Sequence, residues 1–303
     1  MKIFLTGGTG VLGRRVVKLL SENNAEVVVL SRSAENAALI TQLGGTPFSG
    51  DLFNPDDLIR GTAGADAILH LATHIPRASK TSAWALNDRI RTEGTSNLLR
   101  AARTNGVPFF LQQSVALLYG DQQGREVTPE TQLPAKQPAM LRSAVEMERL
   151  IREASGKGLA YAILRFGNFY SADSVQTRGL LENFRKGKVP LIGKGDFFWN
   201  MIHADDAAAA VAFVLFNRAR FENKILNISD FNPLRFNELL TELAMATHSD
   251  IPRRVPRYLA RLVLGKDTFK VMTASYRITD AQAMEGWTPR YRGFREGLRS
   301  LGI

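Results

Sequence analysis

Short apolar runs alternate with amphipathic segments along the first two thirds of the chain. Residues 13–23 and 87–104 space their apolar side chains as one face of a helix does, and the second segment ends at Asn105-Gly106. Apolar runs that predict β-strands occupy residues 2–6, 26–30, 65–71, 107–112 and 159–165. Because these runs do not alternate with polar residues, we expect strands buried on both faces, as in a parallel sheet between helical layers. The strand–helix–strand order then predicts right-handed crossovers and a doubly wound α/β fold.

The periodic pattern loosens after about residue 171. Proline and glycine residues punctuate a loop near position 190, before a strongly apolar helix at 203–216 and a strand at 224–228. The remaining tail combines helical stretches with basic loops. We therefore expect two parts: a sheet-containing domain of residues 1–170 plus 201–230, and a smaller C-terminal substrate-binding lobe of residues 171–200 plus 231–303.

A glycine-rich turn joins the first predicted strand to the first predicted helix. Gly7 permits the tight turn, Gly10 lets the backbone approach a pyrophosphate, and Gly13 allows close packing of the helix on the strand. The helix N-terminus at Val11 and Leu12 offers unpaired N–H groups and partial positive charge to phosphate oxygens. This spacing, in a strand–turn–helix context, predicts a Rossmann dinucleotide-binding domain.

The end of the second predicted strand bears on the choice of dinucleotide. A domain that binds NAD holds the ribose 2′-hydroxyl with an Asp or Glu at this point. The sequence here is Ser31-Arg32-Ser33, without an acid. A carboxylate would repel a 2′-phosphate, whereas Arg32 can pair with one through two parallel hydrogen bonds, and both serines can donate to it. We therefore predict NADP(H) as the cofactor.

The composition excludes several kinds of chemistry. The 303-residue chain has no cysteine, which rules out disulfides, thiolate metal sites and cysteine nucleophiles. With four histidines, we expect no metal site. The net charge of +10 is spread along the chain, with its densest cluster at residues 253–261, and no nucleic-acid-binding motif accompanies it. We expect a small-molecule substrate and no nucleic-acid partner.

The chain also lacks the patterns of a membrane protein or a secreted one. The longest apolar runs, such as residues 207–216, fall short of a membrane span. The N-terminus enters the glycine loop directly after its first strand, which is not the pattern of a signal peptide. We expect a cytoplasmic protein with no membrane partner.

Further segments match, in order, those of a known family. The resemblance is to the extended short-chain dehydrogenase/reductases, the NAD-dependent epimerase/dehydratase family, and it covers roughly residues 1–230. The matching segments are Gly50-Asp51-Leu52, Leu69-His70-Leu71-Ala72-Thr73, Glu93-Gly94-Thr95, Ser114 with Tyr119-Gly120, Leu164 to Tyr170, and Ile202 to Asp206.

This resemblance has implications for the cofactor and for assembly. It implies that the segment of Asp51 and Leu52 meets the adenine, and that Leu71, Ala72 and Thr73 line the cofactor. It also implies a homodimer, because members of this family often pair through two helices of each subunit.

The family's catalytic groups are missing from their expected positions. Family members use a Tyr-x-x-x-Lys pair and a Ser or Thr, of which the tyrosine moves a proton and the lysine lowers its pKa. In the register fixed by Ser143 and Glu148, the tyrosine position is Met140 and the lysine position is Ala144. The Ser/Thr position is Val115, and Arg91 replaces the family's asparagine. Neither Met, Ala nor Val can move a proton.

One hypothesis is therefore an enzyme with reassigned groups. His74 is our first candidate for acid/base chemistry because histidine titrates near neutrality, although it can equally be a loop histidine with no chemical role. Arg142 can bind an anionic or carbonyl oxygen, or it can be an exposed helix charge. Further candidates are Ser114, Asp173 and Tyr170. Arg91 can fill the space of the missing lysine.

The reaction of such an enzyme is open between two classes. It transfers hydride, or it runs a redox-neutral step as a cyclase, isomerase or lyase with the dinucleotide retained. For the substrate we expect contacts from Met140, Asn168, Tyr170 and Trp199. Phe197, Phe198 and Trp199 are equally compatible with the core of the lobe.

The alternative hypothesis is a non-catalytic NADP(H)-binding redox sensor or regulatory protein. An intact glycine loop beside a lost catalytic set is what that role would produce. We rank it second because Asn168, Tyr170 and the 171–200 loop remain family-like. We interpret His203, Asp205 and Asp206 as structural hydrogen-bonding groups rather than metal ligands.

Overall fold

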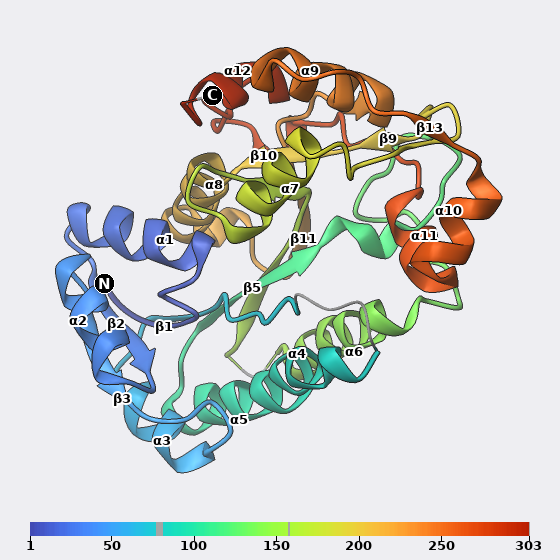
Figure 1. Ribbon diagram of the computed structural model, residues 1–303. Coiled ribbons are helices and arrows are strands. Elements are labelled where there is room, and N and C mark those ends of the chain that lie inside the picture. The colour runs from blue at the N-terminus through green and yellow to red at the C-terminus, as the bar shows by residue number, and fades with distance from the viewer. Residues whose placement is uncertain (77–80, 157, 303) are drawn as a thin grey trace. The chain divides into compact units, whose positions relative to one another are not determined.

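The computed structural model describes residues 1–76, 81–156 and 158–302, and Figure 1 shows its elements. Seven strands form the main sheet, in the order β11-β6-β5-β4-β1-β2-β3. Strand β1 pairs in parallel with β2 and β4, β2 with β3, and β4 with β5. The order reverses at β1, so the predicted doubly wound α/β fold is confirmed. The strands are β1 Lys2–Thr6, β2 Glu26–Ser31, β3 Thr46–Ser49, β4 Ala67–His70, β5 Phe109–Val115, β6 Ala160–Phe166 and β11 Lys224–Ile228.

The central strands are buried on both faces, as their unbroken apolar sequences predict. Ile3, Phe4 and Leu5 of β1 are fully buried, as are Ile68 and Leu69 of β4. The apolar core on one side of the sheet brings β1, β4, β5 and β6 together with side chains of the covering helices. This burial fixes the carboxyl ends of the strands, where ligands of doubly wound sheets bind.

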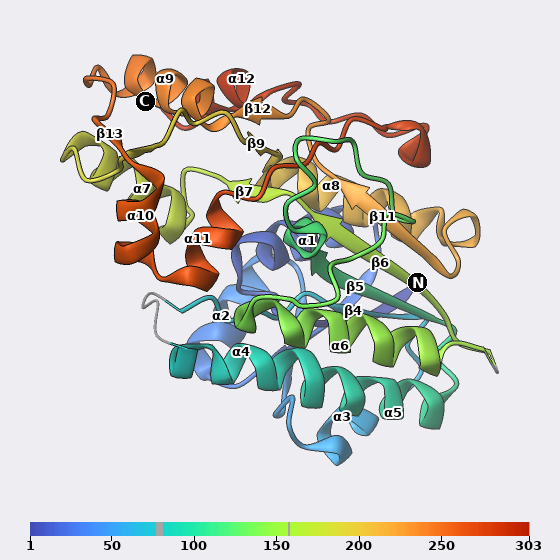
Figure 2. The same cartoon turned by 90° about the vertical axis from the view of Figure 1, so that its right-hand side faces the viewer.

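Helices cover both faces of the sheet. Figures 1 and 2 show α3, α5 and α6 on one face, and α1 and α8 on the other. The α-helices associated with the sheet are α1 Val11–Glu22, α2 Ala34–Gln42, α3 Pro55–Gly61, α4 Ala85–Arg89, α5 Thr95–Asn105, α6 Ala139–Ala154 and α8 Ala204–Phe216. Short 3₁₀ turns occupy Thr81–Trp84, Ala116–Tyr119, Arg218–Arg220 and Gln282–Met284.

The helix predicted at 87–104 differs in detail. It ends as predicted, where Gly106 adopts a left-handed φ of 62° and caps α5. However, it begins earlier, as α4, and the five residues Ile90–Gly94 form a π-helical turn between α4 and α5. A π turn widens the backbone locally, and such turns concentrate at functional sites. Arg91 lies in this turn.

Two strand boundaries also differ from the sequence patterns. The strand expected at 107–112 begins at Phe109, because Pro108 has no N–H to give to a sheet, and it runs on to Val115. Its last part hides polar residues, since Gln112 and Ser114 are 2% exposed. The strand expected at 65–71 is confined to Ala67–His70.

The chain divides into two compact units. One comprises residues 1–115, 140–165 and 208–226, and contains most of the main sheet. The other comprises residues 116–139, 166–207 and 227–303.

The second unit is built from three small two-stranded sheets and short helices. Strand β7 pairs with β10, β9 with β12, and β8 with β13. Their bounds are β7 Asn168–Tyr170, β8 Leu191–Ile192, β9 Phe198–Trp199, β10 Met201–His203, β12 Leu234–Arg235 and β13 Arg254–Val255. The helices are α7 Val175–Arg185, α9 Phe236–Thr247, α10 Arg257–Leu264, α11 Lys266–Met272 and α12 Phe294–Arg299. Within the described residues, every helix is too short or too polar to cross a bilayer.

Candidate functional site

The glycine loop between β1 and α1 is closed to side chains at two of its glycines. A Cβ on Gly7, which has a φ of +82°, would lie 2.6 Å from the backbone of Ala72. A Cβ on Gly13 would lie 2.0 Å from the carbonyl oxygen of Gly7. Both contacts are far inside the van der Waals limit, so the tight turn and the close helix–strand packing depend on glycine.

Gly10 has a different environment. It is exposed, and a Cβ there would meet only the Gly7 carbonyl oxygen, at 3.3 Å. The space above Gly10 is therefore not filled by the protein. Such open space is needed if a pyrophosphate is to approach the backbone. Gly10 also caps α1 without a side-chain hydrogen bond, and the first turn, which includes Val11 and Leu12, has no acidic residue. No acidic side chain of this turn therefore neutralises the positive end of the helix dipole.

The end of β2 presents the predicted arginine to solvent. Ser31 is buried and its hydroxyl donates to the backbone oxygen of Ser33, at 3.1 Å. The Ser33 hydroxyl oxygen caps α2 by accepting from the backbone N–H of Asn36, at 3.2 Å. Between these two anchored serines Arg32 is exposed. The arrangement offers a permanent cation at the carboxyl end of β2.

The other residues expected at the cofactor follow strand β4 (residues 71–73) or strand β3 (residues 51–52). Leu71 is buried, and the backbone of Leu71 and Ala72 lies against Gly7, beside the glycine loop, whereas Thr73 is exposed. Asp51 is exposed after β3, and its Oδ1 accepts from the backbone N–H of Phe53 at 2.9 Å. Leu52 is buried and fills the space next to Gly94. The structure thus brings Leu71 and Ala72 together with the glycine loop.

Arg91 reaches the helix that carries the missing catalytic positions. Its guanidinium Nη1 donates to the backbone oxygen of Met140 at 3.2 Å and to the hydroxyl of Ser143 at 3.4 Å. Met140 is half-buried and Ala144 is fully buried. A cation from the π turn therefore lies at the start of α6, against the residue that occupies the tyrosine position.

Burial also changes the electrostatics of Arg91. The side chain is 7% exposed, and its burial lowers the pKa of Arg91 to about 10, while the charge of Asp88 opposes this fall. The guanidinium is still a cation at neutral pH. The sequence signals Arg91 only as a departure from the family asparagine, and its contact with α6 was not predicted.

Ser114 is held inside the main unit by a buried ion pair. Its hydroxyl donates to Oε1 of Glu148 at 2.6 Å. Arg165 donates to the same carboxylate from Nε at 3.0 Å and from Nη2 at 2.7 Å, and both charged side chains are at most 4% exposed. The hydroxyl of Ser114 is thus committed to the core, whereas Val115, the next residue, is half-buried.

His74 and Arg142 are both exposed. The backbone N–H of His74 donates to Oδ1 of the buried Asn87 at 3.0 Å, which anchors the loop after residues 71–73. Its neighbour His70 is a structural residue: Nδ1 lies 2.6 Å from the hydroxyl oxygen of Thr6, and burial lowers the pKa of His70 to about 4. Of the two histidines, His74 is the one accessible to a ligand.

The second unit contains an apolar cavity of about 100 Å³. Asn168 and Trp199, both expected at the substrate, line it together. The amide of Asn168 donates to the backbone oxygen of Asn200 at 3.3 Å, and the indole N–H of Trp199 donates to that of Met272 at 3.1 Å. The other lining residues are Leu117, Phe198, Val271, Met272, Ala274 and Tyr276.

Tyr170, which was also expected at the substrate, does not line this cavity. It is 2% exposed in the apolar core of the second unit, where its ring packs edge-on against His203 and Phe294. Burial raises the pKa of its phenol, which makes Tyr170 a poor proton donor. Phe197 also belongs to this core, whereas Phe198 lines the cavity, so the aromatic run is divided between the two environments.

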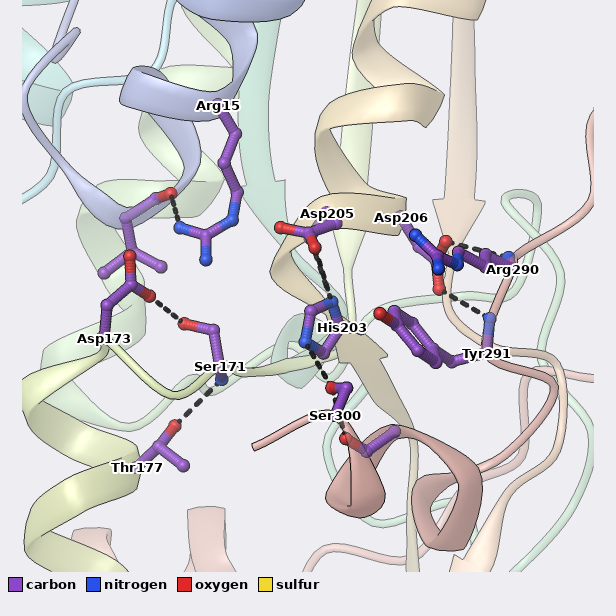
Figure 3. A network of polar contacts seen from close by, with 12 residues as sticks. Arg15, Ser171, Asp173, Thr177, His203, Asp205, Asp206, Arg290, Tyr291 and Ser300 are labelled. Atoms are coloured by element: carbon purple, nitrogen blue, oxygen red, sulfur yellow. Dashed lines mark hydrogen bonds and ion pairs between the residues drawn. The ribbon is translucent and has the colours of Figure 1, made fainter. Parts of the chain in front are cut away.

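His203, Asp205 and Asp206 take part in separate structural contacts. Figure 3 shows His203 between Asp205 and Ser300, and the Asp206 carboxylate facing the backbone of Arg290 and Tyr291. The N–H groups of these two residues donate to Asp206 at 2.8 and 3.1 Å. Across the described residues, no group of three or more His, Cys, Asp or Glu side chains is arranged to hold a metal ion.

Comparisons with known proteins match nearly the whole chain. The model of the family described as "NAD dependent epimerase/dehydratase family" matches residues 3–229. A 3-diazoavenalumate denitrifying reductase from a Streptomyces species is 27% identical over 98% of this chain and 99% of its own length. A 2-alkyl-3-oxoalkanoate reductase from Stenotrophomonas maltophilia is 27% identical over 98% of this chain and 89% of its own. The structure of human epimerase family protein SDR39U1 with NADPH is similar in fold, with a TM-score of 0.82, 17% identity and 99% of each chain covered.

Proposed function

Because the chain belongs to the NAD dependent epimerase/dehydratase family, we propose that it is an NADP(H)-dependent reductase that acts on the carbonyl group of an apolar small molecule. The proposal includes a departure from the family's usual chemistry, since Val115, Met140 and Ala144 occupy the positions of the catalytic Ser-Tyr-Lys set. The observation that carries it is the buried cation of Arg91 beside Met140.

Three features of the main unit fit a bound NADP(H). The open backbone at Gly10 and the uncapped start of α1 suit a pyrophosphate. The exposed Arg32, followed by Ser33, suits a 2′-phosphate. Leu71 and Ala72, beside the glycine loop, with the exposed Thr73 that follows them, suit the rest of the dinucleotide. The human SDR39U1 structure, which contains NADPH, is consistent with this choice.

When bound, NADPH supplies the hydride that the carbonyl carbon accepts, and the carbonyl oxygen then needs a proton. Arg91 cannot supply that proton readily, because its pKa of about 10 lies well above neutrality. Its role in the proposal is electrostatic: a fixed, desolvated cation stabilises negative charge as it develops on the oxygen. The proton comes from His74 or from water, since His74 is accessible and follows residues 71–73.

The cavity of the second unit indicates the class of substrate. Its lining is aromatic and aliphatic apart from the Asn168 amide and the Tyr276 hydroxyl. Among the residues that the structure describes, no cationic side chain lines it. A diphosphate would find no partner there, whereas a hydrocarbon group would be desolvated favourably. The name of one relative, a 2-alkyl-3-oxoalkanoate reductase, fits a carbonyl substrate that carries alkyl chains.

The test is turnover of NADPH with a panel of substrates. Purified protein is mixed with NADPH and either alkyl ketones, 3-oxoalkanoates or nucleotide sugars, while nicotinamide absorbance and product mass are followed. We expect oxidation of NADPH with the apolar carbonyl compounds. Product formation without a change in absorbance would replace the proposal by a redox-neutral reaction. Tight NADPH binding with no turnover of any compound would favour a redox sensor.

Arg91 is tested by a matched pair of variants. Arg91→Met removes the buried cation but keeps an unbranched side chain, and Arg100→Met removes an exposed charge from α5. We expect Arg91→Met to lower kcat by about a hundredfold, the usual cost of losing one oxyanion-stabilising group. Arg100→Met retains full activity. Thermal unfolding of both variants separates a loss of catalysis from a loss of fold.

A further inference from the structure

Helix α10 of the second unit exposes most of its large apolar side chains. Tyr258, Leu262 and Val263 are 71%, 80% and 83% exposed, and Leu259 is 40% exposed. Positions 258, 259, 262 and 263 lie on one face of a helix, because they repeat at intervals of four residues. A soluble helix normally turns such a face inward, yet on α10 the buried residue is Ala260. An exposed apolar face of this kind is typical of a surface that binds a partner.

Basic residues lie beside this apolar face and close to it in the sequence. Arg257 and Arg261, one turn apart, lie along one side of it, and both are exposed. Residues 253–270 contain six basic residues and one acid, Asp267. The Asp267 carboxylate is already engaged, since Oδ2 accepts from the backbone N–H of Ala139 at 2.9 Å. We call this set the α10 surface, namely Tyr258, Leu259, Leu262 and Val263 with Arg253, Arg254, Arg257, Arg261, Lys266 and Lys270.

We propose that the α10 surface binds the face of a membrane that contains anionic lipids. An exposed apolar helix face flanked by Arg and Lys is the pattern of a helix lying in the plane of a bilayer interface. The apolar side chains enter the boundary between headgroups and acyl chains, while the cations attract the anionic headgroups. The net charge of +10 strengthens the attraction over a longer range.

The charge pattern favours a lipid surface over a second copy of this chain. A two-fold dimer through α10 would place the same surface on both sides of the interface. Arg257 and Arg261 would then face the cations of the other copy, with no carboxylate among residues 253–266 to separate them. An anionic bilayer has the opposite charge and an apolar interior, and so complements both parts of the α10 surface.

The surface also adjoins the apolar cavity. Helix α11 follows α10 and packs against it, as Figures 1 and 2 show. Val271 and Met272, at the end of α11, line the cavity. Binding at a membrane would therefore bring the cavity close to compounds dissolved in lipid. This link to the substrate rests on the proposed function, whereas membrane binding itself does not.

This contact differs from a helix that spans a membrane. The expectation of no membrane partner rested on the length of the apolar runs, and α10 has eight residues. A helix of that length cannot cross a bilayer, but it can lie on one. Binding to the surface of a bilayer depends on which apolar side chains are exposed. That exposure is set by the fold and not by the length of an apolar run in the sequence.

The experiment is vesicle sedimentation with the full chain, without cofactor or substrate. One set of vesicles contains phosphatidylcholine alone and the other equal parts of phosphatidylcholine and phosphatidylglycerol. We expect binding to the second set and a weaker binding as salt is added. Equal binding to both sets, or to neither, would overturn the proposal. Because no cofactor is present, either failure leaves the NADP(H) proposal standing.

Variants identify the surface. Leu262→Ser combined with Val263→Ser removes apolar contact without changing charge, and we expect about tenfold weaker binding to the anionic vesicles. Met245→Ser is the matched control, because Met245 is 62% exposed on α9. We expect this variant to bind the anionic vesicles as the wild type does. Circular dichroism confirms that each variant is folded. Full binding by the double variant, or self-association of the wild type that the double variant abolishes, would assign α10 to another contact.

Discussion

The choice between NADPH and NADH depends, in the proposed function, on a single exposed side chain. Arg32 lies after β2 between two serines that have structural contacts, and it is the charged group at the place where a 2′-phosphate would meet the protein. NADH lacks that phosphate. Replacing Arg32 by Ala should therefore weaken NADPH binding and leave NADH binding nearly unchanged.

The exposure of Arg32 sets the size of the effect. A hydrogen bond to a charged group contributes roughly 1.5–3 kcal/mol when it is well protected from water. Solvent reaches Arg32, so screening reduces this contribution to roughly 1–2 kcal/mol, which corresponds to a 5- to 30-fold rise in Kd. Arg32→Glu should exceed this range for NADPH, because it adds repulsion to the loss of the pair.

The assay is fluorescence titration of each variant with NADPH and with NADH at low and high salt. The wild-type preference for NADPH should shrink as salt screens the pair. Arg100→Ala, which removes an exposed arginine from α5, serves as the control and should bind both cofactors normally. An equal loss of affinity for both cofactors in Arg32→Ala would refute the assignment of Arg32 to the 2′-phosphate.

Three other predictions concern stability and the active site. Glu148→Ala should lower the free energy of unfolding in urea by about 3–5 kcal/mol, because it leaves Arg165 buried without its carboxylate; a loss no larger than that of the exposed control Glu146→Ala would contradict this. Burial raises the pKa of Asp230 to about 7, so the folded state retains a proton that the unfolded chain loses above about pH 4. Stability should fall between about pH 4 and 7 and fall less in Asp230→Asn, and parallel curves for the two proteins would exclude this assignment. Met140→Phe should change the KM for the substrate but not the Kd for NADPH, and unchanged kinetics would place Met140 outside the substrate site.

The features predicted from sequence are those encoded by neighbouring residues. The buried strands have unbroken apolar runs, and the glycine loop is defined by spacing alone. The end of α5 follows from the Asn105-Gly106 pair, since glycine adopts the left-handed conformation without strain. Residues 113–115 of β5 escaped prediction. Ser114 is polar but buried, and its partner Glu148 comes from another segment of the chain.

The features that the sequence did not reveal depend on contacts between distant residues. Arg91 meets Met140 across 49 positions of the chain, so no local pattern records the contact. The cavity joins Asn168 and Trp199 to residues of α11, whose own sequence indicates only a short basic helix. The strands of the second unit are two or three residues long, too short for any periodicity to show. The burial of Tyr170 in the core of the second unit could not be predicted, because a motif does not say which way a side chain turns.

The interleaving of the two units limits how this protein can be rebuilt. The chain passes from one unit to the other five times. One of these crossings, between residues 139 and 140, lies within helix α6. No single cut releases an intact half, so neither half can be exchanged as a cassette with that of a relative. A new specificity has to be introduced by replacing individual side chains of the cavity in place. Insertions, circular permutation and reporter fusions are likewise best confined to exposed loops that avoid all five crossings.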